Sequence, residues 1–255
     1  MTEWIQTLAS CFHRVFAPSI YFYRNPFKIC EYNAIVRLAA LSRQDAVLDV
    51  GCGVGKQTFC LAATAGRAVG VDPDPAVIER AEADRRRYHH SLPVEFICAT
   101  LKGAGIESGT FNRVVSFSVI EHIPDWTAVA SECFRVLKPG GHFIFSTDTL
   151  DTITDPSVRD RHRKTHSVCR YGSISVLRGE LEAAGFRVSH AEPLCRTQLA
   201  ARWFEQDIHS GGACSWLRSM LRYVLLSCAE RLSPTSGSGL FLVIDAEKPV
   251  EGDPR

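Results

Sequence analysis

The chain has 255 residues, of which 45% are hydrophobic, and its formal net charge is +1. A chain of this length buries a sizeable core, either as one large domain or as two small ones. The near-neutral charge excludes a global attraction to nucleic acid or to anionic lipid, so any charged partner must meet a local patch. Ten scattered cysteines without a C-x-x-C pair predict a reduced, cytoplasmic protein without a zinc site. We expect neither a signal peptide nor a membrane span of ~20 apolar residues.

The N-terminal part of the sequence predicts two helices. Apolar residues recur at helical spacing over 2–16, Pro18 ends this pattern, and an aromatic-rich stretch at 20–27 leads to a second helix over about 28–41. The pattern does not decide whether these helices cover a binding site or only pack on the edge of a sheet.

The most informative stretch is an apolar strand followed by a glycine-rich turn. Residues 46–50 form the apolar run that is typical of a strand buried on both faces. Gly51, Gly53 and Gly55 follow, and a helix begins after them, which is the arrangement of a nucleotide-sized binding site. A second apolar strand ends in Asp72, 21 residues after Gly51, close to the spacing of ~20 residues expected of an acid that binds ribose hydroxyls.

Two common nucleotide sites do not fit this turn. A dinucleotide fingerprint needs a third glycine at its sixth position, which is Lys56 here. A phosphate-binding P-loop needs a glycine where Val50 stands and a hydroxyl side chain where Gln57 stands. A ligand other than a dinucleotide or a P-loop nucleotide therefore becomes the leading hypothesis.

The rest of the chain alternates strands and helices, which predicts one α/β domain with a doubly wound, mostly parallel seven-stranded sheet. Between the last two predicted strands, residues 193–238 are too long for a hairpin loop and contain two apolar helical stretches. The predicted strands are 46–50, 68–72, 93–98, 113–118, 141–147, 186–191 and 240–246, and the predicted helices between them include 56–65, 75–88, 125–137 and 173–184.

Four separate motifs carry a resemblance to a known family. They are the glycine turn (47–55), the strand ending at Asp72, the run 116–125 and the turn 135–141. Over about residues 45–192 the chain resembles the class I S-adenosylmethionine-dependent methyltransferases of the small-molecule type, including the quinone-biosynthesis O-methyltransferases. The resemblance implies a Rossmann-like sheet with an antiparallel last strand. It divides the single domain into N-terminal cap helices (1–43), a cofactor-binding core (44–192), inserted helices (193–238) and a last strand (239–248).

The resemblance also implies a cofactor, S-adenosylmethionine, and a set of residues around it. The stretch 98–101 lacks the acid that many relatives place after the third strand for the adenine amino group, and Thr100 is the substitute we predict. The residues expected around the cofactor are Asp49, Gly51, Gly53, Gly55, Asp72, Pro73, Thr100, Leu101 and Ser116.

Methyl transfer from a sulfonium needs mainly in-line positioning, and a base helps only when the acceptor is a hydroxyl of high pKa. His122 is the predicted base from its position in the run 116–125; the alternative is that it only packs around the turn at Pro124. No cluster of ligand-type side chains lies near the cofactor motifs, and we expect no metal requirement.

Basic residues crowd the stretch 159–170, which we predict to be a loop after the fifth strand, on the rim of the cofactor site. Such a rim suits an acceptor that carries phosphate or carboxylate, although a solvated charged loop explains the composition equally well. The predicted substrate-binding residues are Arg161, Arg163, Lys164, His166 and Arg170.

These observations favour an enzyme that methylates a small or lipid-linked molecule, with O-methylation preferred over N- or C-methylation. The inserted helices are expected to form a lid over a hydrophobic acceptor, with plain core packing as the alternative. A nucleic-acid substrate is disfavoured because the sequence has no base-reading module. Two other classes stay open: a cofactor-binding partner subunit without activity, and a protein that binds the membrane surface through residues 2–16 and 203–232.

Overall fold

The computed structural model describes residues 24–211, 215–233, 237–250 and 252, except for the side chain of residue 216. The predicted helix over 2–16 and residues 20–23 of the aromatic stretch lie outside these residues. Within them, the eight cysteines are free thiols, and no helix is long and apolar enough to cross a bilayer.

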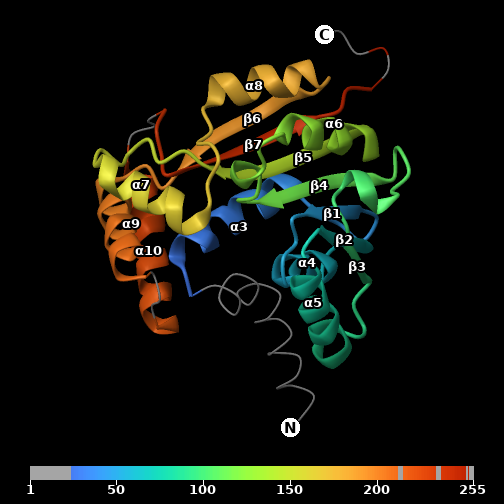
Figure 1. The fold of residues 1–255 in the computed structure, drawn as a ribbon, viewed down its shortest axis with the longest axis horizontal. Coiled ribbons are helices and arrows are strands. Elements are labelled where there is room, and N and C mark those ends of the chain that lie inside the picture. Colours follow the sequence, from blue (N-terminus) through green and yellow to red (C-terminus); the bar gives the residue numbers. More distant parts are fainter. Residues whose placement is uncertain (1–23, 212–214, 234–236, 251, 253–255) are drawn as a thin grey trace.

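Seven strands form one sheet in the order β3-β2-β1-β4-β5-β7-β6 (Figure 1). The strands β1 to β5 pair in parallel, whereas β7 is antiparallel to both β5 and β6. This order confirms the Rossmann-like sheet with an antiparallel last strand. The strands are β1 (Ala46–Val50), β2 (Arg67–Asp72), β3 (Val94–Cys98), β4 (Phe111–Phe117), β5 (Leu137–Asp148), β6 (Arg187–Leu194) and β7 (Phe241–Glu247).

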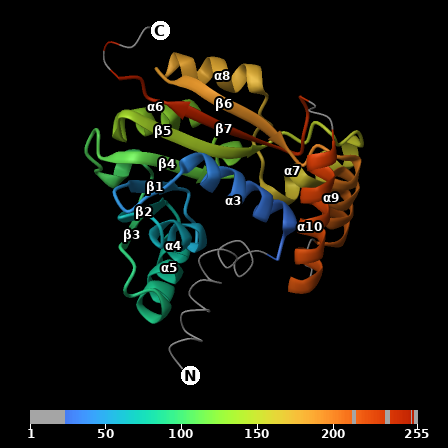
Figure 2. The same cartoon turned by 180° about the vertical axis from the view of Figure 1, so that it is seen from behind.

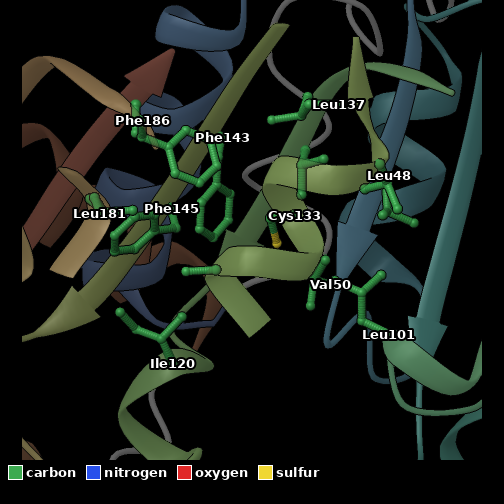
Figure 3. Packing of buried hydrophobic residues seen from close by; sticks show 14 of the residues in the cluster. Leu48, Val50, Leu101, Ile120, Cys133, Leu137, Phe143, Phe145, Leu181 and Phe186 are labelled. Atoms are coloured by element: carbon green, nitrogen blue, oxygen red, sulfur yellow. The ribbon is translucent and has the colours of Figure 1, made fainter. Parts of the chain in front are cut away.

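Helices cover both faces of the sheet because successive strand side chains alternate between them (Figures 1 and 2). Leu48 faces a core with α6 (Trp126–Val136) and α8 (Ile174–Ala183), which also holds Phe143 and Phe145 (Figure 3). Val47 faces the opposite core with α3 (Pro26–Ala39) and α4 (Lys56–Ala62). The helix α5 (Pro75–Tyr88) lies beside β2 and β3.

A third apolar cluster holds the inserted segment against the sheet. It joins Phe27 of α3, Phe241 of β7 and Phe204 of α9 (Gln198–Ser210), whose rings meet edge to face or tilted. The helix α10 (Trp216–Leu232) contributes Leu226 to this cluster. Two inserted helices were predicted, and α9 is part of the core rather than a separate flap.

The predicted loop over 159–170 is wrong, because most of this stretch is the helix α7 (Pro156–His166). Asp155 caps the helix by accepting a hydrogen bond from the backbone N–H of Ser157, and proline occupies the first helical position. Only Val158 and His162 of α7 are buried, one turn apart. With so narrow an apolar face, hydrophobic periodicity gave no helix signal.

Candidate active site

The glycine turn after β1 forms the floor of the first half of the site. A Cβ on Gly51 would lie 2.6 Å from both methyl carbons of Val119, and one on Gly55 would lie 2.5 Å from the ring of Phe96. Gly53 also has a positive φ, +53°, but nothing lies within 4 Å of its Cβ position. Neighbouring side chains therefore hold the turn from two sides, and the backbone at Gly53 stays open to a ligand.

Asp72 stands beside this open backbone at the end of β2. Its Oδ2 accepts a hydrogen bond from the N–H of Gly53 at 3.0 Å, and its Oδ1 accepts one from the N–H of Asp74 at 3.0 Å. Each carboxylate oxygen retains further acceptor capacity. The two backbone bonds therefore fix the carboxylate in place while leaving lone pairs for the two hydroxyls of a ribose.

Two other predicted cofactor residues lie beneath the turn and brace it. Asp49 is 1% exposed and accepts a hydrogen bond from the hydroxyl of Thr58 at 2.7 Å. Burial raises the pKa of Asp49 to about 7, a shift that the Thr58 bond opposes and the charge of Asp72 increases. The buried hydroxyl of Ser116 donates to the carbonyl of Val50 at 2.9 Å, which ties β4 to β1.

The residues expected near the adenine lie at the ends of β2 and β3. Pro73 is exposed after Asp72, Leu101 is buried in the core, and the exposed Thr100 accepts a hydrogen bond from the N–H of Gly103 at 3.2 Å. The structure thus brings the predicted cofactor residues to one edge of the sheet. Asp49, Leu101 and Ser116 support this edge, while the glycines, Asp72, Pro73 and Thr100 form its surface.

The second half of the site lies where β4 and β5 end, and it contains ionisable side chains that were not predicted. The ammonium of Lys28 lies 2.8 Å from a carboxylate oxygen of Glu31 and donates to the hydroxyl of Ser118 at 2.6 Å. The Ser118 hydroxyl donates to the other oxygen of Glu31 at 2.5 Å. Burial opposes the charge on Lys28, but the attraction of three nearby carboxylates outweighs burial and raises the pKa of this lysine.

Glu121 is the second of these three carboxylates, and it is fully buried. Its Oε2 accepts a hydrogen bond from the hydroxyl of Thr147 at 3.3 Å, whereas its Oε1 has no hydrogen-bond partner among the described residues. Burial and, next, repulsion from Asp148 raise the pKa of Glu121 well above its usual value, and Lys28 opposes the shift. A buried carboxylate oxygen without a partner is costly, and a ligand hydroxyl or amine would satisfy it.

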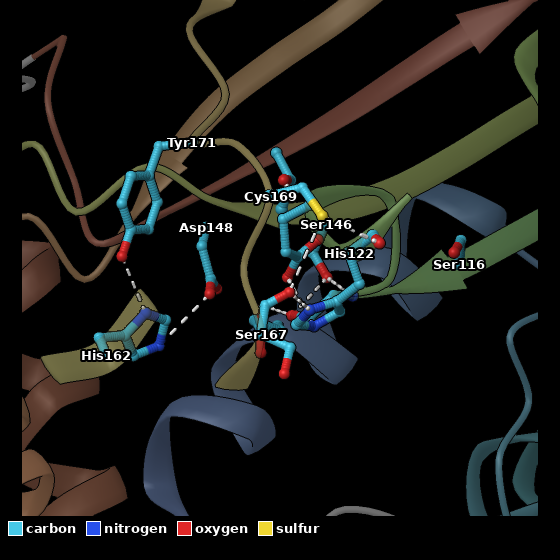
Figure 4. Close-up of polar contacts among 12 residues, drawn as sticks. Ser116, His122, Ser146, Asp148, His162, Ser167, Cys169 and Tyr171 are labelled. Atoms are coloured by element: carbon cyan, nitrogen blue, oxygen red, sulfur yellow. Dashed lines mark hydrogen bonds and ion pairs between the residues drawn. The ribbon is translucent and has the colours of Figure 1, made fainter. Parts of the chain in front are cut away.

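Asp148, the third carboxylate, faces a histidine and a tyrosine (Figure 4). Its Oδ2 lies 3.4 Å from Nε2 of His162, whose Nδ1 lies 3.1 Å from the hydroxyl of Tyr171. That hydroxyl donates to the carbonyl of Arg159, so it accepts from Nδ1, and Nε2 of the neutral imidazole carries no proton. Burial raises the pKa of Asp148 to about 7 and lowers that of His162 to about 4.

His122, the predicted base, lies at the rim of this half rather than inside it. Its imidazole is 37% exposed, its Nδ1 lies 3.4 Å from the carbonyl of Ser167, and its Nε2 lies 4.0 Å from Oε1 of Glu121 (Figure 4). The side chain therefore borders both solvent and the unpartnered carboxylate oxygen.

The five predicted substrate-binding residues do not form one cationic rim. Arg161 lies 3.1 Å from Nδ1 of His209 on α9, and the exposed Lys164 pairs with Asp160 at 3.5 Å. The other three contact neighbouring side chains: the exposed Arg163 lies over the Tyr171 ring, the exposed His166 lies beside the ring of His162, and the half-buried Arg170 donates to both oxygens of Glu180.

A comparison with known families agrees with this geometry. Residues 48–145, which run from β1 into β5, match a family model described as a methyltransferase domain. Over this stretch the chain is thus similar to the class I S-adenosylmethionine-dependent methyltransferase family. S-adenosylmethionine is the methyl donor of this family, and the open backbone at Gly53 and the fixed carboxylate of Asp72 fit its adenosine part.

The curated relatives of this chain have different printed activities. The chain is 29% identical to a sterol 24-C-methyltransferase of Saccharomyces cerevisiae, over 65% of this chain and 45% of that protein. It is 31% identical to a ubiquinone biosynthesis O-methyltransferase of Xanthomonas oryzae, over 48% of this chain and 49% of that protein. The chain thus spans about half the length of these curated relatives.

Among solved structures, a geranyl diphosphate C-methyltransferase of Streptomyces coelicolor shares the methyltransferase fold. Its TM-score is 0.64 at 14% identity, and the match covers 85% of this chain and 76% of that one. At this identity the likeness concerns the fold alone.

Proposed function

We propose that this chain transfers the methyl group of S-adenosylmethionine to a small-molecule acceptor, preferably to a hydroxyl, held where β4 and β5 end. The observation that carries the proposal is the buried, unpartnered Oε1 of Glu121. This oxygen is near the cofactor motif, because Val119, two residues earlier, packs against the glycine turn at Gly51. The first half of the site, with the glycine turn and Asp72, is called here the cofactor half. It therefore adjoins the unsatisfied carboxylate of Glu121.

Glu121 is the group that takes the proton of the acceptor. When bound, S-adenosylmethionine supplies a methyl carbon activated by its sulfonium. The Glu121 carboxylate accepts a hydrogen bond from the acceptor hydroxyl, orients its oxygen toward that carbon, and holds the proton when the new O–C bond forms and the C–S bond breaks. The electron pair of the broken bond stays on sulfur, so the charges balance.

The neighbours of Glu121 tune this role. Burial and repulsion from Asp148 raise the pKa of the Glu121 carboxyl, and the attraction of Lys28 opposes that shift. His122 lies between Oε1 and solvent, at 4.0 Å from the carboxylate, and passes the proton outward after transfer. The prediction of His122 as a participant is kept, but as the second group in the relay.

A hydrophobic or lipid-linked acceptor is the finer part of the proposal. One of the two curated relatives is named for a sterol and the other for the biosynthesis of ubiquinone. Sterols and ubiquinone are both largely apolar molecules. Arg161 and Lys164 lie on the exposed side of α7 and would meet an anionic end of such an acceptor.

The test is methyl transfer by the full chain with S-adenosylmethionine labelled in its methyl group. A total lipid extract and an aqueous metabolite extract of cells are offered separately, and transferred label is counted in each. Label in the lipid fraction supports the proposal, and label in the aqueous fraction alone overturns the lipid-linked acceptor. Saturable cofactor binding without transfer to either fraction would favour the alternative of a non-catalytic partner subunit.

A further inference from the structure

The helix α10 has its polar and apolar sides reversed relative to a core helix. Among its described side chains, the buried ones are Ser219, Arg222 and Leu226, so only one of the three is apolar. Its large apolar side chains face solvent instead. Those exposed by 44% to 87% are Leu217, Leu221, Val224, Leu225 and Leu232.

These five side chains form one stripe, called here the α10 stripe. At 3.6 residues per turn they fall within a sector of about 100°, and from Leu217 to Leu232 the stripe is about 22 Å long. The helices α9 and α10 stand together at the end of the molecule next to α7, away from α4 and α5 (Figures 1 and 2). The stripe is therefore an outer surface on the side of the second half of the site, which lies where β4 and β5 end and is called here the acceptor half.

Polar contacts on the inner side lock this orientation. Arg222 donates to both carboxylate oxygens of Asp207 on α9, at 2.9 and 3.1 Å, and its guanidinium lies over the ring of Trp203. The hydroxyl of Tyr223 accepts from the side-chain amide of Asn33 on α3 at 2.8 Å. Rotating α10 to bury its leucines would break these contacts. The contacts therefore keep the stripe facing outward.

The charges around the stripe are of one sign. Arg218 and Arg231 are exposed at its two margins. The acid of the described helix, Glu230, turns inward, where it pairs with Arg196 and accepts from the N–H of Thr197. Within the described part of α10, the outward side thus offers leucines and arginines but no carboxylate.

We propose that the α10 stripe docks the protein on the surface of an anionic phospholipid bilayer. Leucines enter the boundary between headgroups and acyl chains, and Arg218 and Arg231 meet the lipid phosphates. A symmetric pairing of two copies through this helix is disfavoured, because it would gather Arg218 and Arg231 of both copies at one interface without a carboxylate from the described outward side of α10.

Docking in this way brings lipid close to the acceptor half, since α10 packs on α3, which carries Lys28 and Glu31. The proposal rests on the surface of α10 and not on methyl transfer, so the two can fail independently.

The experiment is co-flotation of the full chain with two kinds of vesicle, a mixture of phosphatidylglycerol and phosphatidylcholine, and phosphatidylcholine alone. We expect binding to the mixed vesicles, weakened by salt because it screens the arginines. The double change Leu217→Ser and Leu221→Ser should lower the partition coefficient by about tenfold or more. Val176→Ser on α8, which is 51% exposed, is the matched control and should leave it unchanged.

Changing Arg218→Gln and Arg231→Gln together should weaken binding to the mixed vesicles only. Absence of binding, or equal binding by the leucine variant and the control, would overturn the proposal. So would a wild-type dimer in analytical ultracentrifugation that the leucine variant lacks, since the stripe would then be an interface between copies. Unchanged affinity for S-adenosylhomocysteine in every variant shows that the fold is intact.

Discussion

The two halves of the site are built in different ways although they share one sheet edge. In the cofactor half, backbone conformation defines the surface, and the carboxylates of Asp49 and Asp72 are each held by hydrogen bonds. In the acceptor half, side chains define the surface. Three carboxylates surround the ammonium of Lys28, and one oxygen of Glu121 has no hydrogen-bond partner among the described residues. Under the proposed function, the half that binds the same cofactor in every turnover is held rigid by hydrogen bonds, and the half that would react keeps an unsatisfied group.

The largest change in affinity is expected from Asp72→Ala. Removing two acceptor oxygens for the ribose should weaken binding of S-adenosylhomocysteine by about 1.5–3 kcal/mol, roughly tenfold to 150-fold. Isothermal titration calorimetry measures this, with Asp160→Ala on the exposed side of α7 as control. Unchanged affinity for Asp72→Ala would remove Asp72 from the ribose site.

A change in the acceptor half should act on stability instead. Lys28→Met leaves Glu31, Glu121 and Asp148 without their shared cation and should lower the free energy of unfolding by about 2 kcal/mol at pH 8. The loss should shrink at pH 6, because protonated carboxyls need no cation. Urea denaturation at both pH values tests this, with the exposed Lys102→Met as control. An equal loss at both would contradict the charge balance assigned to this half.

Substitutions at two glycines distinguish the cost of backbone strain from the loss of cofactor binding. Gly53 and Gly109 both have positive φ and open space at the Cβ position. Alanine at either should cost about 1–2 kcal/mol of stability through backbone strain. Only Gly53→Ala places a methyl group where the cofactor lies, and calorimetry should show about tenfold weaker binding for it alone. Equal affinities of the two variants would place the cofactor elsewhere.

The next prediction concerns how the free energy of unfolding depends on pH. The pKa of Asp49 is raised to about 7 by burial, so the folded state holds a proton that the unfolded state releases near pH 4. The stability that this proton contributes is lost as pH rises toward 7. Asp49→Asn should remove this loss, about 2–3 kcal/mol between pH 5 and 8, while Asp160→Asn should not. A wild-type slope in Asp49→Asn would show that Asp49 is ionised when folded.

The sequence predicted what depends on local pattern. The strand β1, the glycine turn and Asp72 lie within residues 46–72, so their spacing along the chain was enough to place them together. The acceptor half was missed because Lys28, Glu121 and Asp148 meet from three elements far apart in the chain. Their individual motifs gave no sign that they share one buried space.

The same limit explains the errors outside the strands. The apolar residues of α10 were read as a pocket lid, because periodicity identifies a face of a helix but not the direction in which it points. Arg222 and Tyr223 decide that direction through contacts to Asp207 and Asn33, which no local pattern contains. Trp216 begins this helix, and its side chain lies outside the described residues.

The role of Glu121 is tested most directly by the pH profile of methyl transfer for Glu121→Gln, using the acceptor fraction that the labelling experiment identifies. The wild-type rate should rise with pH as the carboxyl loses its proton, since burial raises its pKa. The variant should lose this rise and be slower by about 10²–10⁴-fold with unchanged affinity for S-adenosylhomocysteine, whereas the exposed Glu79→Gln should match the wild type. A Glu121→Gln rate within a few-fold of wild type, with the rise lost in His122→Gln instead, would contradict the account.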